Sequence, residues 1–281
     1  MSVIRSRFVD VDGIRTHYLE AGEGPVVVLL HSGEFGGAAE ISWEFTLPAL
    51  AEKFRVVAPD WLGFGRTDKV FDFADGRARV FRHMRRFLEV MAIGEADFIG
   101  NSMGGSNLAR IAASRPVILP IRSLVLCSGG GFTPETDERK TLLSYDGTPE
   151  AMAALLNAML HDRKWGGDAD YVARRQELAT MPGAWECAAA ARFKSPAVAA
   201  KGSGFGAADT TEYGNIAVPT LIVAGAEDRL REPGYAQELG AQIPDCEVHV
   251  LDACGHCPNI EQADDFNRLA LRFLERVHVV I

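Results

Sequence analysis

The sequence predicts an α/β protein in which a mostly parallel, doubly wound sheet carries a helical cap inserted between two strands. Short apolar runs alternate with amphipathic stretches, which is typical of parallel strands joined by helices. The runs are unbroken, which favours strands buried on both faces. Between residues 132 and 214 the strand signals stop, and about 80 residues is too long for a loop. The 281 residues suffice for one large domain or two small ones.

The strands are expected in order from the N-terminus. The first two flank Asp12-Gly13, a dipeptide that is typical of a β-hairpin turn. The later runs are rich in β-branched or aliphatic residues, which favours buried strands. The predicted strands are 7–11, 15–20, 26–30, 54–58, 96–99, 123–127, 220–224 and 247–251.

Helical patterns lie between the strand runs. In 78–92 the apolar residues recur at the spacing of one helix face, and the same holds for 264–277. A further helix is expected over 106–113, ending before Pro116. We therefore expect helices on both faces of the sheet.

The helical segment 132–214 is expected to form a cap, or lid, over the sheet. Thr148-Pro149-Glu150 is a typical helix start, and apolar residues follow it at helical spacing. Open α/β sheets bind ligands at the carboxyl ends of their strands, so the cap is expected there. The predicted division is a core of residues 1–131 and 215–281 and a cap of residues 132–214.

Composition and charge exclude several classes of protein. The net charge is −9, which argues against a nucleic-acid partner. The longest aliphatic run, 26–30, is far shorter than the ~20 residues that span a bilayer. The N-terminal residues contain no apolar signal core, so we expect a cytoplasmic protein that does not bind membranes. Five cysteines at irregular spacings do not indicate a disulfide framework.

A G-x-S-x-G motif at 100–104 points to a nucleophilic serine. The motif follows a predicted strand and precedes a predicted helix, as a nucleophile elbow requires. Small residues are needed two positions either side of the serine because the strained turn brings the backbone close to its neighbours. We interpret Ser102 as the nucleophile; the alternative is a tight glycine turn that only packs a helix on the sheet.

A serine hydroxyl needs a base, and the base needs an acid to orient it. In this kind of fold the chain order is serine, acid, histidine. Asp228 follows one late strand and His256 follows the next, so both are expected at the carboxyl edge of the sheet. Glu227 and Asp252 are rival acids.

Two backbone N–H groups are expected to stabilise the negative charge that develops during attack. One belongs to Met103, directly after the nucleophile. The other is expected in the glycine-rich segment after the strand 26–30, where Gly33 is the first choice and Ser32 the second. His31 ends that strand and precedes the serine, so it fits a supporting role in this loop.

Cys254-Gly255-His256-Cys257 is a C-x-x-C motif of the kind found in disulfide isomerases. A redox role would leave the serine elbow unexplained, and the motif lies near the end of the chain. Two thiols and one histidine fall short of a four-ligand zinc site. We therefore expect no metal or organic cofactor, although a reversible bond between Cys254 and Cys257 that disturbs His256 stays open.

The chain resembles the α/β-hydrolase fold family over nearly its full length. Within that family it resembles the meta-cleavage-product hydrolases, which break carbon–carbon bonds in ring-opened aromatics. The resemblance is carried by the stretches 43–50 (WEFTLPAL), 58–65 (APDWLGFG), 100–105 (GNSMGG) and 261–269 (EQADDFNRL). Asn101 and the stretch 261–269 are more specific to this subfamily.

The resemblance implies four substrate-binding positions. Arg175 falls on a family arginine that holds the substrate carboxylate, although it could be a surface arginine beside Glu177. Asn101 precedes the serine, Ser42 stands where the family usually has asparagine, and Cys257 stands where it usually has tryptophan. The smaller Cys257 is expected to reshape the pocket near carbon 6 of the substrate.

The oxyanion loop departs from the family in two further ways. Ser32 and Phe35 replace a usual glycine and a common proline, and Glu34 adds a negative charge where a dienolate would need stabilising.

The implied function is hydrolysis of a 2-hydroxy-6-oxo-dienoate to a 2-hydroxypentadienoate and a carboxylic acid. The family also implies a homodimer or higher homo-oligomer. Two rivals remain: a carboxylesterase or lactonase that uses the same three residues, and a non-catalytic binding protein on this fold. A small molecule is the expected partner in each case.

Overall fold

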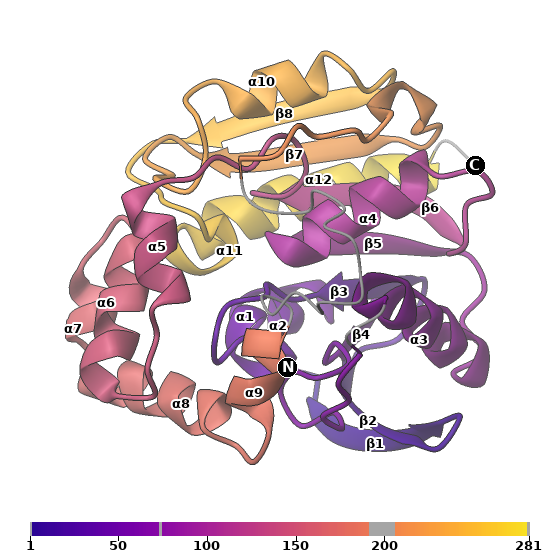
Figure 1. Ribbon diagram of the computed structural model, residues 1–281. Coiled ribbons are helices and arrows are strands. Elements are labelled where there is room, and N and C mark those ends of the chain that lie inside the picture. Colours follow the sequence, from indigo (N-terminus) through magenta and orange to yellow (C-terminus); the bar gives the residue numbers. More distant parts are fainter. Residues whose placement is uncertain (1, 73–74, 191–205, 280–281) are drawn as a thin grey trace.

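The protein contains one eight-stranded sheet in the order β1-β2-β4-β3-β5-β6-β7-β8. The computed structural model describes residues 2–72, 75–190 and 206–279. β1 and β2 form an antiparallel hairpin, β2 pairs antiparallel with β4, and the remaining pairs are parallel. The mostly parallel sheet is confirmed (Figure 1). Its strands are β1 (Arg5–Val11), β2 (Ile14–Ala21), β3 (Val26–Leu30), β4 (Arg55–Pro59), β5 (Ala96–Asn101), β6 (Ile121–Cys127), β7 (Thr220–Gly225) and β8 (Cys246–Leu251).

Burial along the strands follows their place in the sheet. All residues of β5 and β7 are buried, as the unbroken apolar runs predict. β8 was expected to be buried on both faces, and this is wrong, because its residues are half-buried or exposed. The physical reason is its position as the last strand of the sheet, where only one neighbouring strand covers it.

Helices cover both faces of the sheet, which confirms the doubly wound arrangement. One core cluster joins strand residues to α3 (Gly76–Val90), α4 (Met103–Ala113) and α10 (Tyr235–Gly240). The other joins the opposite side chains of the strands to α2 (Thr46–Leu50) and α12 (Ala263–Val279). Neighbouring residues such as Val27 and Val28 belong to different clusters, because side chains alternate along a strand.

Between β6 and β7 the described residues form helices and no strand. Figure 1 shows the helices labelled α5 to α8 gathered at the side of the sheet where β8 ends. The Thr148 side chain caps α6 by accepting a hydrogen bond from the Ala151 N–H at 3.2 Å, and Pro149 is the first helical residue, as predicted. Residues 191–205 of the expected cap lie outside the described part of the chain. The helices are α5 (Asp137–Leu143), α6 (Pro149–Met159), α7 (Lys164–Gly167), α8 (Ala169–Ala179), α9 (Ala184–Ala190) and η1 (Tyr213–Asn215).

A third core cluster connects these helices to loops at the carboxyl ends of the strands. Met152, Leu156 and Val172 of α6 and α8 pack with Phe35 from the loop after β3. Cys257, which follows β8, belongs to the same cluster. This cluster therefore encloses the edge of the sheet where a ligand site is expected. Among the described residues, no helix is long and apolar enough to cross a bilayer.

The packing of α3 yields a stability prediction. Phe87 is fully buried and lies edge-on to Tyr18 at 5.7 Å between ring centroids, whereas Val90 on the same helix is 41% exposed. We expect Phe87→Ala to lower the free energy of unfolding by about 3–5 kcal/mol, through lost burial and the cavity left behind. Val90→Ala is the matched control and should change it by less than about 0.5 kcal/mol. Urea titration measures both; equal losses would contradict the packing described for α3.

Candidate active site

Ser102 lies at a sharp turn between β5 and α4. Its backbone has φ 51° and ψ −110°, a conformation that is strained for a residue with a side chain. Two hydrogen bonds hold it: the Ser102 N–H donates to the Cys127 carbonyl, and the Ser106 N–H donates to the Ser102 carbonyl, both at 2.8 Å. The turn thus projects the serine hydroxyl from the carboxyl edge of the sheet.

The glycines of the motif are required by close backbone contacts. A Cβ atom on Gly100 would lie 2.5 Å from the backbone of Gly104 and Gly105. A Cβ atom on Gly104 would lie 2.1 Å from the Leu30 carbonyl oxygen at the end of β3. No real Cβ tolerates such distances, so the elbow can pack against β3 and β5 only with glycine at both positions.

Three side chains from separate loops form a hydrogen-bonded chain at this edge. The Ser102 Oγ lies 2.7 Å from Nε2 of His256, and Nδ1 of His256 lies 2.7 Å from Oδ2 of Asp228. His256 and Asp228 are 3% and 8% exposed. Because the carboxylate faces Nδ1, the proton of the neutral ring belongs on Nδ1, and Nε2 is left to accept the serine proton.

The rival acids lie elsewhere. Glu227 and Asp252 are exposed, and the carboxylate of Glu227 accepts a hydrogen bond from the Cys254 N–H at 2.9 Å. Burial opposes ionisation of Asp228, but attraction to His256 and Arg231 outweighs this, so its pKa lies below the ordinary value. Asp228 therefore remains an anion when His256 takes up a proton.

Arg231 supports Asp228 and was not predicted from the sequence. Its guanidinium is buried and donates 2.8 Å hydrogen bonds to the carbonyls of Ser128 and Gly130 after β6. It also contributes to the low pKa of Asp228. No motif marks this residue; the only signal is a cation three positions after the acid.

Glu261 holds the loop that carries His256, a role that the sequence did not predict. Its carboxylate accepts hydrogen bonds from the N–H groups of Gly255 at 3.0 Å, Cys257 at 3.2 Å and His161 at 2.6 Å. The His256 N–H donates to the Met159 carbonyl at 2.9 Å. The loop that carries His256 is thereby fastened to the end of α6.

The loop after β3 meets the residue that follows Ser102. A Cβ atom on Gly33 would lie 2.5 Å from Sδ of Met103, so these two residues are in direct contact. Met103 is the first residue of α4, so its N–H has no acceptor within the helix. Gly33 and Met103 are therefore close enough to serve one oxyanion together.

His31 fixes the loop after β3. Its Nε2 accepts a hydrogen bond from the Trp61 N–H at 3.0 Å, so Nδ1 carries the proton and donates to the Ser32 carbonyl at 2.6 Å. Burial lowers the pKa of His31, which keeps the ring neutral. The Ser32 carbonyl is thus held in place beside Gly33.

Arg175 is fully buried on α8, so it is not a surface arginine. Its Nη1 donates to the carboxylate of Glu34 and its Nη2 donates to the Tyr171 hydroxyl at 3.0 Å. Burial alone would raise the pKa of Glu34, but attraction to Arg175 holds it below the ordinary value. Arg175 was expected to bind the substrate carboxylate. In the structure it is paired with the carboxylate of Glu34.

Asn101 connects the nucleophile strand to the histidine loop. Its amide donates to the carbonyls of Cys127 at 3.2 Å and His256 at 3.5 Å. The thiol of Cys257 lies 3.9 Å from the Asn101 Oδ1 atom. The Ser42 hydroxyl is buried and has no hydrogen-bond partner among the described residues, while the Ser42 carbonyl accepts a bond from Asn259 at 2.6 Å.

Cys254 and Cys257 are free and fully buried. Burial raises the pKa of both thiols well above the ordinary value. Because the thiolate is the reactive form, neither residue is primed for redox chemistry. Within the described ranges, no group of three or more metal-ligating side chains comes together.

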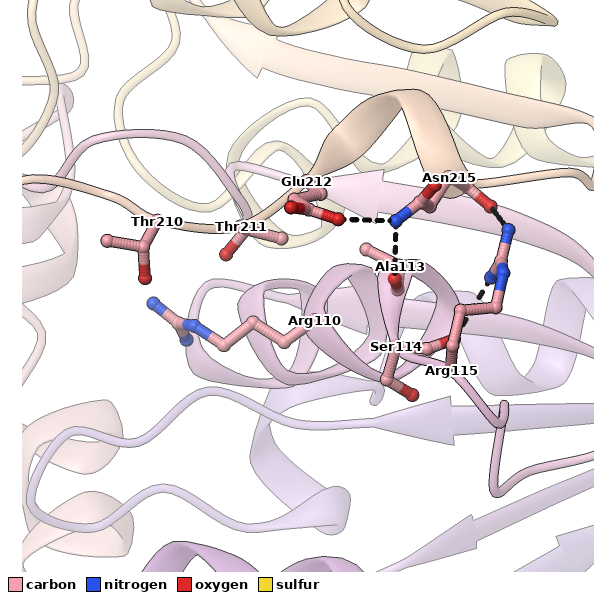
Figure 2. A pocket seen from close by; sticks show the side chains of 8 residues that line it. All are labelled: Arg110, Ala113, Ser114, Arg115, Thr210, Thr211, Glu212 and Asn215. Atoms are coloured by element: carbon pink, nitrogen blue, oxygen red, sulfur yellow. Dashed lines mark hydrogen bonds between the residues drawn. The ribbon is translucent and has the colours of Figure 1, made fainter.

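A surface depression elsewhere on the molecule takes no part in this arrangement. Figure 2 shows it at the C-terminal end of α4, between Arg110 and Arg115 and the segment Thr210–Asn215. Ser102 lies at the opposite end of the same helix. The depression is therefore separate from the triad.

Known proteins resemble this chain over nearly its whole length. A model described as the alpha/beta hydrolase family matches residues 18–269. The 2-hydroxy-6-oxo-6-(2'-aminophenyl)hexa-2,4-dienoic acid hydrolase of Metapseudomonas resinovorans is 32% identical, over 96% of this chain and 91% of the relative. The 2-hydroxymuconate semialdehyde hydrolase of Pseudomonas putida is also 32% identical, over 93% of this chain and 91% of the relative.

Solved structures agree with these relatives. A serine hydrolase involved in carbazole degradation is 31% identical with a TM-score of 0.81, covering 97% of this chain and 99% of that one. A meta-cleavage product hydrolase from Pseudomonas fluorescens IP01 is 28% identical with a TM-score of 0.85, covering 96% and 97%.

The hydrogen-bonded chain predicts that activity depends on Asp228 and not on the neighbouring acids. Asp228→Asn keeps the shape of the site but removes the anion that orients His256, so kcat should fall roughly 10⁴-fold on whichever substrate the enzyme turns over. Glu227→Gln and Asp252→Asn are matched controls that each remove one carboxylate nearby, and they should retain kcat within about three-fold, as expected of exposed sites. Comparable losses in a control and in Asp228→Asn would contradict the assignment of the acid.

Proposed function

The chain belongs to the alpha/beta hydrolase family and, within it, to the meta-cleavage-product hydrolases that break carbon–carbon bonds, and we propose that it hydrolyses a 2-hydroxy-6-oxo-dienoate. The products are a 2-hydroxypentadienoate and a carboxylic acid. The observation that carries this proposal is a Ser–His–Asp chain beside a buried arginine, in a chain similar along its length to hydrolases of such dienoates.

The proposed roles follow from the geometry of the loops. Ser102 is the nucleophile or the residue that activates water, His256 moves the protons, and Asp228 orients His256. The N–H groups of Met103 and Gly33 bind the oxyanion, with Ser32 as the second choice for the latter. No cofactor is required for these steps.

The reaction proceeds in two stages. Ketonisation moves the proton of the 2-hydroxyl group to carbon 5, with His256 as the shuttle. Attack on the carbon 6 carbonyl then gives a tetrahedral oxyanion. When the C5–C6 bond breaks, its electron pair is delocalised into the 2-oxo group, and protonation gives the 2-hydroxypentadienoate. Water supplies the hydroxyl group of the carboxylic acid.

Substrate binding is assigned to residues around the triad. Arg175 holds the substrate carboxylate with two parallel hydrogen bonds. Asn101, Ser42 and Cys257 lie in the same buried region and shape the pocket. Residues 132–214 act as the cap over a core of 1–131 and 215–281. The cluster that joins α6 and α8 to the loops after β3 and β8 supports this division.

One observation favours a second candidate function. Glu34 compensates the charge of Arg175, and an ester or lactone needs no buried cation. A carboxylesterase or lactonase could use the same three residues. The hydrogen-bonded triad on a strained elbow argues against a non-catalytic binding protein.

We propose a cytoplasmic homodimer or higher homo-oligomer as the working form. The resemblance to the family supports the assembly. Light scattering of the purified protein measures the mass in solution. A monomer of 30.5 kDa would contradict the proposed assembly.

The proposed reaction is tested by following the visible absorbance of a ring-cleavage dienoate beside release from a p-nitrophenyl ester. Ser102→Ala should abolish both activities, and Arg175→Gln should reduce dienoate turnover at least 100-fold while sparing the ester, because it removes a charged contact worth about 3 kcal/mol. Arg174→Gln is the matched control: it is the neighbouring exposed arginine on α8, paired with Glu44 at 2.9 Å, and should retain dienoate turnover.

A second variant guards against misfolding. Arg175→Gln alone leaves Glu34 buried without its cation, so the double variant Arg175→Gln with Glu34→Gln is measured beside it, together with thermal unfolding. If p-nitrophenyl ester hydrolysis is fast and equal in the wild type and both variants, and the dienoate is not cleaved, carbon–carbon hydrolysis is contradicted and the esterase is favoured.

A further inference from the structure

Glu34 and Arg175 form a buried ion pair where the loop after β3 meets α8. The side chain of Glu34 is 3% exposed and that of Arg175 is 0% exposed. The two residues are 141 positions apart in the chain, and one belongs to the core and the other to the helices between β6 and β7. The pair therefore joins the two parts of the molecule at the loop that carries Gly33.

The position of Glu34 links the cation to the oxyanion loop. Glu34 directly follows Gly33, which contacts Met103 beside the nucleophile. Two residues later, a Cβ atom on Gly36 would lie 2.5 Å from the Arg175 carbonyl oxygen, so the loop lies against α8. A substrate that reaches from the oxyanion position to Arg175 must therefore pass Glu34.

One nitrogen of the Arg175 guanidinium has no hydrogen-bond partner among the described residues. Nη1 faces Glu34 and Nη2 faces the Tyr171 hydroxyl, while Nε is buried without a hydrogen-bond partner in the described part of the chain. Within the described part of the chain, Glu34 is the carboxylate that pairs with this cation. A second carboxylate at this cation would leave two buried anions against one cation, which is strongly unfavourable.

We propose that Glu34 is a specificity-determining residue: a substrate carboxylate binds by taking the place of Glu34 on Arg175. This rests on the proposed function, in which the substrate carries its carboxylate to Arg175. Glu34 then acts as an internal competitor that lowers the affinity of the site for anions and leaves the affinity for uncharged analogues unaltered. It also keeps Arg175 compensated while the site is empty.

The loop has the means to release Glu34. Gly33, Gly36 and Gly37 surround it in sequence, and Gly36 has a positive φ of 76°. Ser32 is two residues before Glu34 and is among the groups that lower the Glu34 pKa, so its hydroxyl is available to receive the carboxylate after it leaves the guanidinium. The exchange therefore needs a side-chain rotation within one short loop.

The test uses two probes that lack the 6-keto group and so are not cleaved: hexa-2,4-dienoate and its amide. Isothermal calorimetry measures the Kd of each probe for the full-length protein. Glu34→Gln keeps the shape of the side chain and removes the competing charge. It should tighten the dienoate Kd at least ten-fold, or about 1.4 kcal/mol, and leave the amide Kd within two-fold.

Glu44→Gln is the matched control. Glu44 pairs with Arg174, the neighbouring residue of α8, at 2.9 Å on the outer side of the helix. Its replacement should alter neither Kd. Glu34→Asp serves as the second variant if Glu34→Gln unfolds, as judged by thermal unfolding. The shorter carboxylate withdraws from Arg175, so it should tighten dienoate binding by an intermediate factor.

The outcomes separate the inference from the proposed function. Dienoate binding that is unchanged or weaker in Glu34→Gln, or tightening that is equal for the amide, would overturn the inference and leave carbon–carbon hydrolysis untouched. Conversely, a wild-type protein that never cleaves ring-cleavage dienoates would overturn the proposed function. Selective tightening of hexa-2,4-dienoate in Glu34→Gln would still uphold the competition at Arg175.

Discussion

The site depends on a single backbone constraint, the left-handed conformation of Ser102 between β5 and α4. This conformation places the hydroxyl above the carboxyl edge of the sheet and starts α4 at Met103, whose N–H is free to bind an anion. It also brings the turn so close to β3 and β5 that only glycine fits at 100 and 104. The strained turn is tolerated because the strand that leads into it is fully buried and because the Ser102 N–H is bonded to the Cys127 carbonyl of β6.

Hydrogen-bond distances alone do not identify a nucleophilic serine, because the molecule contains a second serine–histidine–aspartate chain in a different setting. Ser6, His17 and Asp60 form a second chain with distances of 2.9 Å and 2.7 Å. Ser6, however, lies within the edge strand β1, without a strained turn and without a helix start after it. Asp60 also accepts bonds from the N–H groups of Ala39 and Arg66, so this chain fastens the hairpin to the core.

Most of the fold could be predicted from the sequence, because unbroken apolar runs and helix faces are local patterns. Ser102 and His256 were predicted from the motif and from the chain order. The burial of β8 was predicted wrongly, because a sequence does not show which strand lies at the edge of a sheet. The partner of Arg175 could not be predicted either. Glu34 and Arg175 are distant in sequence, and only the packing of α8 on the loop after β3 reveals that they form a pair.

Carbon–carbon hydrolysis requires that water enters the substrate at the carbonyl attacked beside Ser102. The most direct measurement is mass spectrometry of the products formed from a ring-cleavage dienoate in ¹⁸O-labelled water. We expect one ¹⁸O atom from the hydrolysis step in the released carboxylic acid, and cleavage between carbons 5 and 6. An intact carbon skeleton after complete exposure to the enzyme, or ¹⁸O incorporated only through hydrolysis of an ester, would contradict it.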